Sequence, residues 1–253
     1  MANSIPVGIS NRHFHLSKEH VVVLFGPGYA LKKYRTISQT GQFAAEETLD
    51  VQGPKGTVER IRVVGPLRGQ TQLEIAPSDA HRLGIKPPVR YSGDLDGSAG
   101  ATLIGPRGRV ELPEGIIIPQ RHIHMSPSDA RQFGVYDRAR VIVRALAEKS
   151  FSPLNEPRDV VFDNVLIRVD PLFVLDFHLD VDEANASGLK NGDRVEITGF
   201  SSYNKHAKHS GLITERDVRE AIRAKHKIYL DERCIITPAA KDIARAHDVF
   251  RRS

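Results

Sequence analysis

An internal repeat constrains this chain more than any other feature of its sequence. Residues 9–17, Ile-Ser-Asn-Arg-His-Phe-His-Leu-Ser, resemble residues 118–126, Ile-Pro-Gln-Arg-His-Ile-His-Met-Ser, with five of nine positions identical and an offset of 109 residues. A second similarity joins residues 74–80 to residues 178–184, with an offset of 104 residues. Because the two offsets differ by only five residues, the sequence indicates a tandem duplication in which each copy is a structural unit.

The local patterns within each copy predict short strands and brief helices. β-branched segments with partial alternation are separated by Gly and Pro turns, as in residues 59–64, 140–144 and 194–197. Short helices are expected where a capping residue is followed by about two turns and a glycine, as in residues 78–84, 128–134 and 182–188. Residues 1–200 contain no long amphipathic crossover helix, so closed barrels are favoured over a parallel α/β sheet.

We therefore expect a mainly β fold with two tandem β-barrel domains, short capping α-helices and a small α-containing C-terminal tail. The predicted limits are residues 1–105 for the first barrel, 106–199 for the second and 200–253 for a basic extension. The first boundary is placed by the Gly-rich segment 94–100, which precedes the second copy. The extension has no copy elsewhere, and capping residues predict helices over residues 214–224 and 238–247.

Composition and charge exclude several classes of protein. Cys234 is the only cysteine, so an intrachain disulfide and a cysteine zinc site are excluded, which favours a cytoplasmic setting. We find no apolar run of about 18 residues and no basic-then-apolar N-terminus, so we expect neither a membrane span nor a secretory signal. Residues 201–253 hold 12 Lys/Arg and 7 Asp/Glu, which accounts for the whole net charge of +5. A neutral body without a basic stripe disfavours nucleic-acid binding.

Each repeat carries a His-x-His motif, and residues two apart in a strand face the same side about 6.5–7 Å apart. A third ligand is expected downstream at corresponding places: Glu74 lies 59 residues after His15, and His178 lies 54 residues after His124. The candidate metal ligands are therefore two triads: His13, His15 and Glu74 in one repeat, and His122, His124 and His178 in the other. Three such ligands leave a coordination position open, which is typical of catalytic zinc, although cobalt, iron and manganese also accept them.

Other interpretations of these residues stay open from the sequence alone. Glu74 could be an ordinary strand residue and His178 a core histidine. Arg68, six residues before Glu74, could bind a phosphate or another oxyanion beside a metal, or it could be a solvated arginine in a turn. No P-loop motif is present, so nucleotide hydrolysis of that kind is disfavoured.

Several segments together resemble the PduL-type phosphate propanoyltransferases, phosphotransacylases associated with bacterial microcompartments. The similarity runs from about residue 5 to residue 199, and its most specific segments are residues 10–17, 42–48, 90–95, 121–125 and 182–186. The resemblance implies two β-barrels with a two-zinc site at their junction. It also implies the interconversion of an acyl-CoA, propanoyl-CoA or acetyl-CoA, and inorganic phosphate with acyl phosphate and CoA.

The resemblance also assigns roles to the candidate residues. It makes His13, His15 and Glu74 the ligands of the zinc that meets the CoA sulfur. It makes the three histidines of the second repeat the ligands of a second zinc with positions open to water. Arg68 matches the phosphate-site arginine of the family. The length of the acyl chain is left open, because one methylene changes discrimination by only about 1–3 kcal/mol.

The alternative function is zinc-dependent hydrolysis of thioesters or phosphoesters on the same scaffold. We expect a homo-oligomer with no nucleic-acid or membrane partner. The segment 145–158 is longer than the usual family hairpin at this place, so barrel edges or subunit contacts are expected to differ. The family-like sequence starts almost at once at residue 5, so we do not expect encapsulation through the amphipathic N-terminal extension that members routed into microcompartments often carry. The tail, at residues 212–215 and 235–242, is similar to a terminal segment of microcompartment-linked enzymes. It is therefore either a contact element for such enzymes, inside a microcompartment, or a stabilising appendix.

Overall fold

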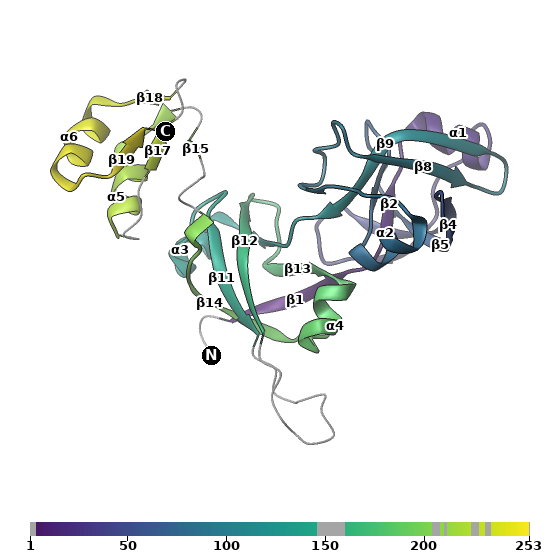
Figure 1. The fold of residues 1–253 in the computed structure, drawn as a ribbon, viewed down its shortest axis with the longest axis horizontal. Coiled ribbons are helices and arrows are strands. Elements are labelled where there is room, and N and C mark those ends of the chain that lie inside the picture. The colour runs from purple at the N-terminus through teal and green to yellow at the C-terminus, as the bar shows by residue number, and fades with distance from the viewer. Residues whose placement is uncertain are drawn as a thin grey trace, which may run out of the picture.

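The computed structural model describes residues 4–145, 160–203, 208–209, 212–223, 228–230 and 234–252, so most of the expected hairpin at residues 145–158 lies outside the described residues. Two closed six-stranded barrels form the body of the protein, side by side, and the C-terminal segment lies beyond the second barrel (Figure 1). The predicted mainly β fold with two barrels is confirmed.

The first barrel closes through β8, which pairs with both β4 and β9. Its ring runs in the order β9, β6, β2, β5, β4, β8, and the short strands β3 and β7 pair with β4 and β9 outside it. The bounds are β2 (His13–His15), β3 (Lys33–Thr36), β4 (Phe43–Gln52), β5 (Thr57–Gly65), β6 (Gln72–Glu74), β7 (Val89–Arg90), β8 (Ala99–Ile104) and β9 (Arg109–Pro119).

The second barrel has the same topology in the order β1, β13, β10, β12, β11, β14. Its strands are β1 (Ser4–Ser10), β10 (His122–Met125), β11 (Arg140–Ala145), β12 (Val161–Val169), β13 (Asp176–Asp180) and β14 (Arg194–Phe200). In both rings the His-x-His strand runs parallel to one neighbour and antiparallel to the strand that carries the third candidate ligand. The two sequence repeats therefore correspond to two barrels of the same strand order and direction.

The two repeats exchange one strand, so the pairing does not follow the predicted limits 1–105 and 106–199. Strand β1 precedes the first His-x-His motif but pairs with β13 and β14 of the second barrel. Strand β9 precedes the second motif but pairs with β6 and β8 of the first. Sequence similarity locates copies along the chain, whereas hydrogen bonding decides which barrel a strand completes.

Four short helices pack against barrel strands: α1 (Lys18–Phe25) and α2 (Pro77–Leu83) in the first barrel, and α3 (Pro127–Phe133) and α4 (Val181–Ser187) in the second. Helices α2, α3 and α4 end at a left-handed glycine, as the sequence predicts. Their starts differ from the prediction: α3 and α4 begin two residues earlier, with capping boxes at Ser126 and Asp180, and the N-cap of α2 is Ala76, which has no side-chain cap. Each barrel has its own apolar core. The barrels also contact each other through polar groups, because the Ser78 backbone and hydroxyl both donate to Asp182.

The C-terminal segment folds around a separate small core that includes Ile213, Val218 and Ala244. Its helices, α5 (Glu215–Arg223) and α6 (Pro238–His247), lie where the capping residues predicted them. Among the described residues of this segment, five short strands accompany them: β15 (Lys208–His209), β16 (Leu212–Ile213), β17 (Ile228–Leu230), β18 (Ile235–Ile236) and β19 (Phe250–Arg252). The expected α-containing tail is thus an α/β unit, because strands of two or three residues carry too little periodicity to be recognised.

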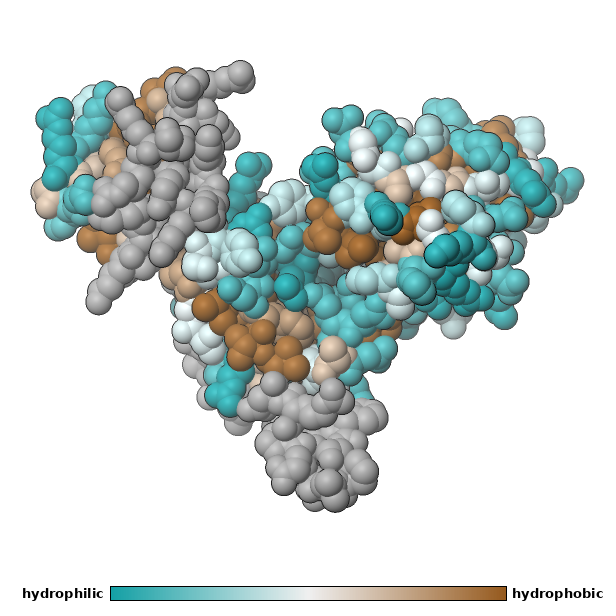
Figure 2. All heavy atoms as spheres, viewed as in Figure 1, coloured by the Kyte–Doolittle hydropathy of each residue, from teal (hydrophilic) through white to brown (hydrophobic). Residues whose placement is uncertain are grey.

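Hydrophilic residues cover much of the surface in the view of Figure 2, and hydrophobic residues gather in small patches. Within the described residues, no helix is both long enough and apolar enough to cross a membrane.

The close packing of the exchanged strand β1 at Gly8 leads to a prediction about the stability of the protein. A Cβ atom there would lie 2.5 Å from Oδ2 of Asp176, which is closer than non-bonded atoms approach. We expect Gly8→Ala to lower the free energy of unfolding by about 1–3 kcal/mol, because the buried carboxylate must move. Thermal and urea unfolding measure this. Gly199→Ala, in β14, is the matched control because nothing lies within 4 Å of the added carbon. Equal stability of the two variants would contradict the close packing of β1.

Candidate functional site

The six candidate ligands and Arg68 line one cavity, whose volume is about 980 Å³ and whose walls come from both barrels. Within each triad, the potential ligand atoms all lie within 4.8 Å of one another. The sequence predicted both groups, and the structure brings the members of each group together.

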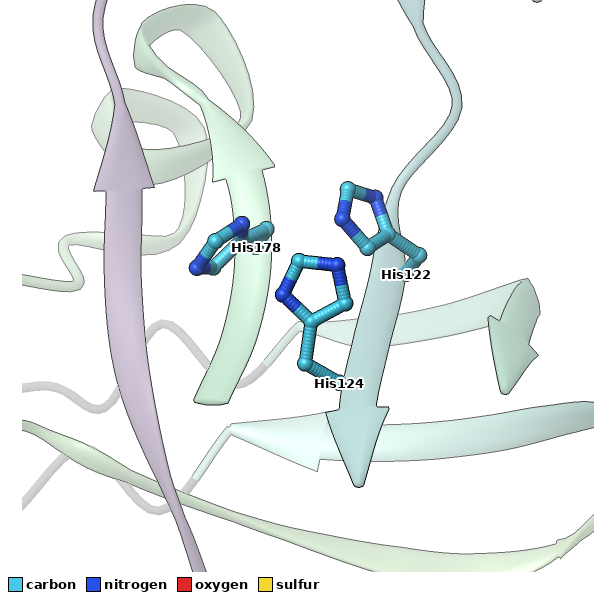
Figure 3. A group of neighbouring side chains, drawn as sticks. All are labelled: His122, His124 and His178. Atoms are coloured by element: carbon cyan, nitrogen blue, oxygen red, sulfur yellow. The ribbon is translucent and has the colours of Figure 1, made fainter. Parts of the chain in front are cut away.

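Strand register explains the second triad. His122 and His124 lie on the same face of β10, and His178 of β13 is the direct antiparallel partner of His122. The ring centroids of the three histidines are 4.6–5.1 Å apart. Figure 3 shows the three rings gathered between the two strands that carry them. Such spacing allows one nitrogen from each ring to reach a common metal ion.

The first triad repeats this register with one substitution. Glu74 of β6 is the antiparallel partner of His13 of β2, and it stands where His178 stands in the other barrel. The His13 Nε2 atom lies 3.7 Å from Glu74 Oε2, and the His13 and His15 rings are 4.9 Å apart. This barrel therefore offers two imidazoles and a carboxylate instead of three imidazoles.

Hydrogen bonds decide which ring nitrogens remain for a metal. Nδ1 of His13 lies 2.9 Å from the Asn11 carbonyl, and Nδ1 of His122 lies 2.8 Å from the Gln120 carbonyl. The Nδ1 atom of His15 is 3.1 Å from the Val64 carbonyl. A carbonyl only accepts, so Nδ1 carries the proton in these rings and Nε2 keeps a lone pair for coordination.

Burial keeps three of the imidazoles neutral. It lowers the pKa of His15 to about 2 and the pKa of His122 to about 3. Burial likewise lowers the pKa of His124 far below its ordinary value, and the neighbouring His122 and His178 lower it further. Neutral imidazole is the form that binds a metal ion.

Buried atoms without partners show that a metal ion fits the second triad. Both ring nitrogens of His124 are buried and have no hydrogen-bond partner. An unsatisfied buried polar group costs about 1–3 kcal/mol, so an imidazole of this kind needs a compensating ligand. The nitrogen and oxygen donors of the two triads suit a divalent transition metal with an open coordination position.

Arg68 faces this cavity from the loop between β5 and β6. Its backbone N–H donates to the Leu16 carbonyl, and its Nη1 atom donates to the Ser92 hydroxyl at 3.0 Å. No carboxylate within the described residues forms an ion pair with its guanidinium in this structure. A fixed guanidinium on a cavity wall is suited to bind an anion.

A second arginine, which was not predicted from the sequence, also lines the cavity. Arg168 is partly buried, lines the same cavity and lies over the Phe173 ring at 5.4 Å, while Phe173 also packs against His124. Arg168 is the parallel register partner of His124, which is why it lies beside the second triad. Only knowledge of the pairing between β10 and β12 would have revealed it.

The arginine that begins each His motif has a structural role. Arg12 forms an ion pair with Asp79 in the first turn of α2, and Arg121 forms one with Glu183 in the first turn of α4, both at 2.5 Å. These contacts tie the His-x-His strand to the helix that follows the third candidate ligand. The repeated Arg-His-x-His pattern therefore combines a packing residue with two candidate ligands.

Comparisons with known proteins agree with this architecture. The profile of a family described as phosphate propanoyltransferase matches residues 6–190. A phosphate propanoyltransferase of Thermotoga maritima is 50% identical over 196 residues, which cover 78% of this chain and 90% of the relative. Proteins of the same name from Rhodobacter capsulatus and Listeria monocytogenes are 48% and 41% identical; the matches cover 76% and 78% of this chain and 86% and 88% of the relatives.

These matches place the chain among the acyltransferases. It belongs to the phosphate propanoyltransferase family, as its sequence motifs indicated. Residues 200–253 lie outside the region matched by the family profile.

The geometry of the second triad generates a prediction about metal content. We expect His124→Ala to remove about one equivalent of bound divalent metal per chain, because a coordinating imidazole is lost. Elemental analysis after dialysis measures the loss, and circular dichroism checks the fold. His81→Ala is the control, because His81 is an exposed histidine outside the cavity. Equal metal content in the two variants would contradict the candidate site.

Proposed function

We propose that the protein interconverts an acyl-CoA, propanoyl-CoA or acetyl-CoA, and inorganic phosphate with acyl phosphate and CoA at a two-zinc site. The observation that carries this proposal is the meeting of both triads and Arg68 in one cavity, in a chain of the phosphate propanoyltransferase family. The choice of phosphate and a propanoyl group as reactants follows from the name of the relatives, phosphate propanoyltransferase.

In this proposal His13, His15 and Glu74 hold one zinc ion, and His122, His124 and His178 hold the other. When bound, zinc supplies Lewis-acid stabilisation of the negative charge that develops on the thioester oxygen and the departing sulfur. The protein contributes His15, His122 and His124 as neutral imidazoles at fixed positions, because burial lowers the pKa of each, so these three ligands need no deprotonation at neutral pH.

The chain's own residues position the reactants. Arg68 holds phosphate by charge-assisted hydrogen bonds, and Arg168 adds a second positive charge on the opposite barrel. A phosphate oxygen attacks the thioester carbonyl carbon, the carbon–oxygen bond forms, and the carbon–sulfur bond breaks. The phosphate proton leaves with the thiolate as CoA. No acyl-enzyme is required, and Cys234 lies outside the cavity in the C-terminal segment.

Hydrolysis on the same scaffold is the competing function, because water could take the place of phosphate. The two reactions differ in one measurable respect. A phosphotransacylase releases CoA only when phosphate is present and forms one acyl phosphate for each CoA. A hydrolase releases CoA without phosphate.

The role of Arg68 generates a second test. We expect Arg68→Ala to lower kcat/KM for phosphate by about 10–100-fold, because a charge-assisted contact with the anion is lost. Zinc content should not change. The assay follows CoA release from propanoyl-CoA and acetyl-CoA at varied phosphate concentration, with Arg82→Ala on exposed α2 as the control. If kcat/KM for phosphate were unchanged in Arg68→Ala, Arg68 would have only a structural role and would not bind phosphate.

The separate core of the C-terminal segment generates a third test. All candidate site residues lie before residue 200, so deletion of residues 204–253 should leave zinc content and phosphate-dependent turnover within about twofold of the full chain. Metal analysis and the same assay measure this. A loss of either property would show that the segment supports the site. Contact of this segment with microcompartment enzymes, location in a microcompartment and homo-oligomer formation stay predictions.

A further inference from the structure

In each barrel, a polar residue lies two positions before the third candidate ligand and contacts it. Nε2 of Gln72 donates to Oε1 of Glu74 at 2.6 Å. Oδ2 of Asp176 lies 3.1 Å from Nε2 of His178. Gln72 and Asp176 are 104 residues apart, as are Glu74 and His178, but the hydrogen-bonding roles are reversed. The Gln72 amide donates to the Glu74 carboxylate, whereas the Asp176 carboxylate accepts from the His178 imidazole.

The surroundings of Gln72 fix the direction of its amide. The backbone N–H of Gly93 can only donate, and it bonds Gln72 Oε1 at 2.7 Å. The amide nitrogen must therefore face Glu74 and the Ser92 hydroxyl, which it contacts at 2.9 Å. Since Gln72 is only 1% exposed, water cannot readily replace these bonds. Oε1 of Glu74 is thus occupied, and Oε2 is the oxygen near His13.

The surroundings of Asp176 fix the tautomer of His178. Asp176 is 6% exposed, and its Oδ2 atom also accepts a hydrogen bond from the Ser38 hydroxyl of the first barrel at 3.0 Å. The absence of a side chain at Gly8 leaves space for this carboxylate. A carboxylate acceptor beside Nε2 of His178 places the ring proton there. The lone pair for coordination is then on Nδ1.

We propose that Gln72 and Asp176 are equivalent positioning residues that select the coordinating atom of the third ligand in each zinc site. Gln72 leaves Oε2 of Glu74 for the first ion, and Asp176 leaves Nδ1 of His178 for the second. This inference rests on the part of the proposed function in which both triads bind zinc. Partners that orient metal ligands in this way typically contribute about 10–100-fold to metal affinity.

Each positioning residue also connects its site to a second element. Gln72 reaches Arg68 through the shared hydroxyl of Ser92, which accepts from both side chains. Asp176 reaches the loop before β4 through Ser38. The geometry of the third ligand is therefore coupled to the anion-binding arginine in one barrel and to the opposite barrel in the other.

Zinc titration in single-site backgrounds tests the proposal without the reaction. His124→Ala leaves the first site, and His13→Ala leaves the second; affinity is measured by competition of Zn²⁺ with a chromogenic chelator. We expect Q72E to weaken the first site by about 10–100-fold and to leave the second within about threefold, because a carboxylate cannot donate to Glu74. D176A should show the reverse pattern. Each variant is thus the matched control for the other.

A conservative variant separates positioning from packing. In D176N the amide oxygen can still accept from Nε2 of His178, so zinc affinity of the second site should stay within about threefold and well above that of D176A. Q72L provides a second variant if Q72E does not fold, with circular dichroism of the metal-free proteins as the check.

Equal weakening of both sites by either substitution, or no weakening at all, would overturn the inference. Failure of the unsubstituted chain to bind two zinc ions would instead overturn the proposed function.

Discussion

The reciprocal exchange of β1 and β9 is the constraint on which the rest of the structure depends. Each of these strands belongs to one repeat by sequence and to the other barrel by hydrogen bonding. Neither barrel can close its ring with strands of its own repeat alone. The connections from β1 to β2 and from β9 to β10 therefore cross between the barrels beside the His-x-His motifs. This crossing places both motifs on the wall of a shared cavity.

Strand register then determines the chemistry within each barrel. His13 opposes Glu74 and His122 opposes His178, so the third candidate ligand always faces the first histidine. The residue two positions earlier, Gln72 or Asp176, faces the second histidine in the same way. Side chains alternate with a period of two, so a slip of one residue would turn the entire set toward the other face. The extensive apolar cores beneath these strands disfavour such a slip.

The repeat in the sequence predicted much of the site, because duplication turns single weak motifs into corresponding pairs. Both triads were expected from the spacing within the two repeats, whereas the phosphate-site role of Arg68 came from the family resemblance. The barrel limits could not be predicted, since an exchanged strand looks the same in sequence as one that pairs within its own repeat. Arg168, Ser92 and Asp176 were missed for a related reason. Their proximity to the ligands depends on pairing between strands, which a linear pattern does not record.

The exchange of β1 has a consequence for how the chain folds during synthesis. Residues 4–10 are synthesised long before their pairing partners, because Val7 pairs with Phe177 and Ile5 pairs with Val195. All strands of the first barrel have been synthesised once β9 is complete. Strand β1 stays unpaired until its partners β13 and β14 have been synthesised. Loop-closure entropy over such a separation slows the final pairing step. The β1 segment thus stays unpaired and exposed until the second barrel has been synthesised, and the last ring to close is the one that β1 completes.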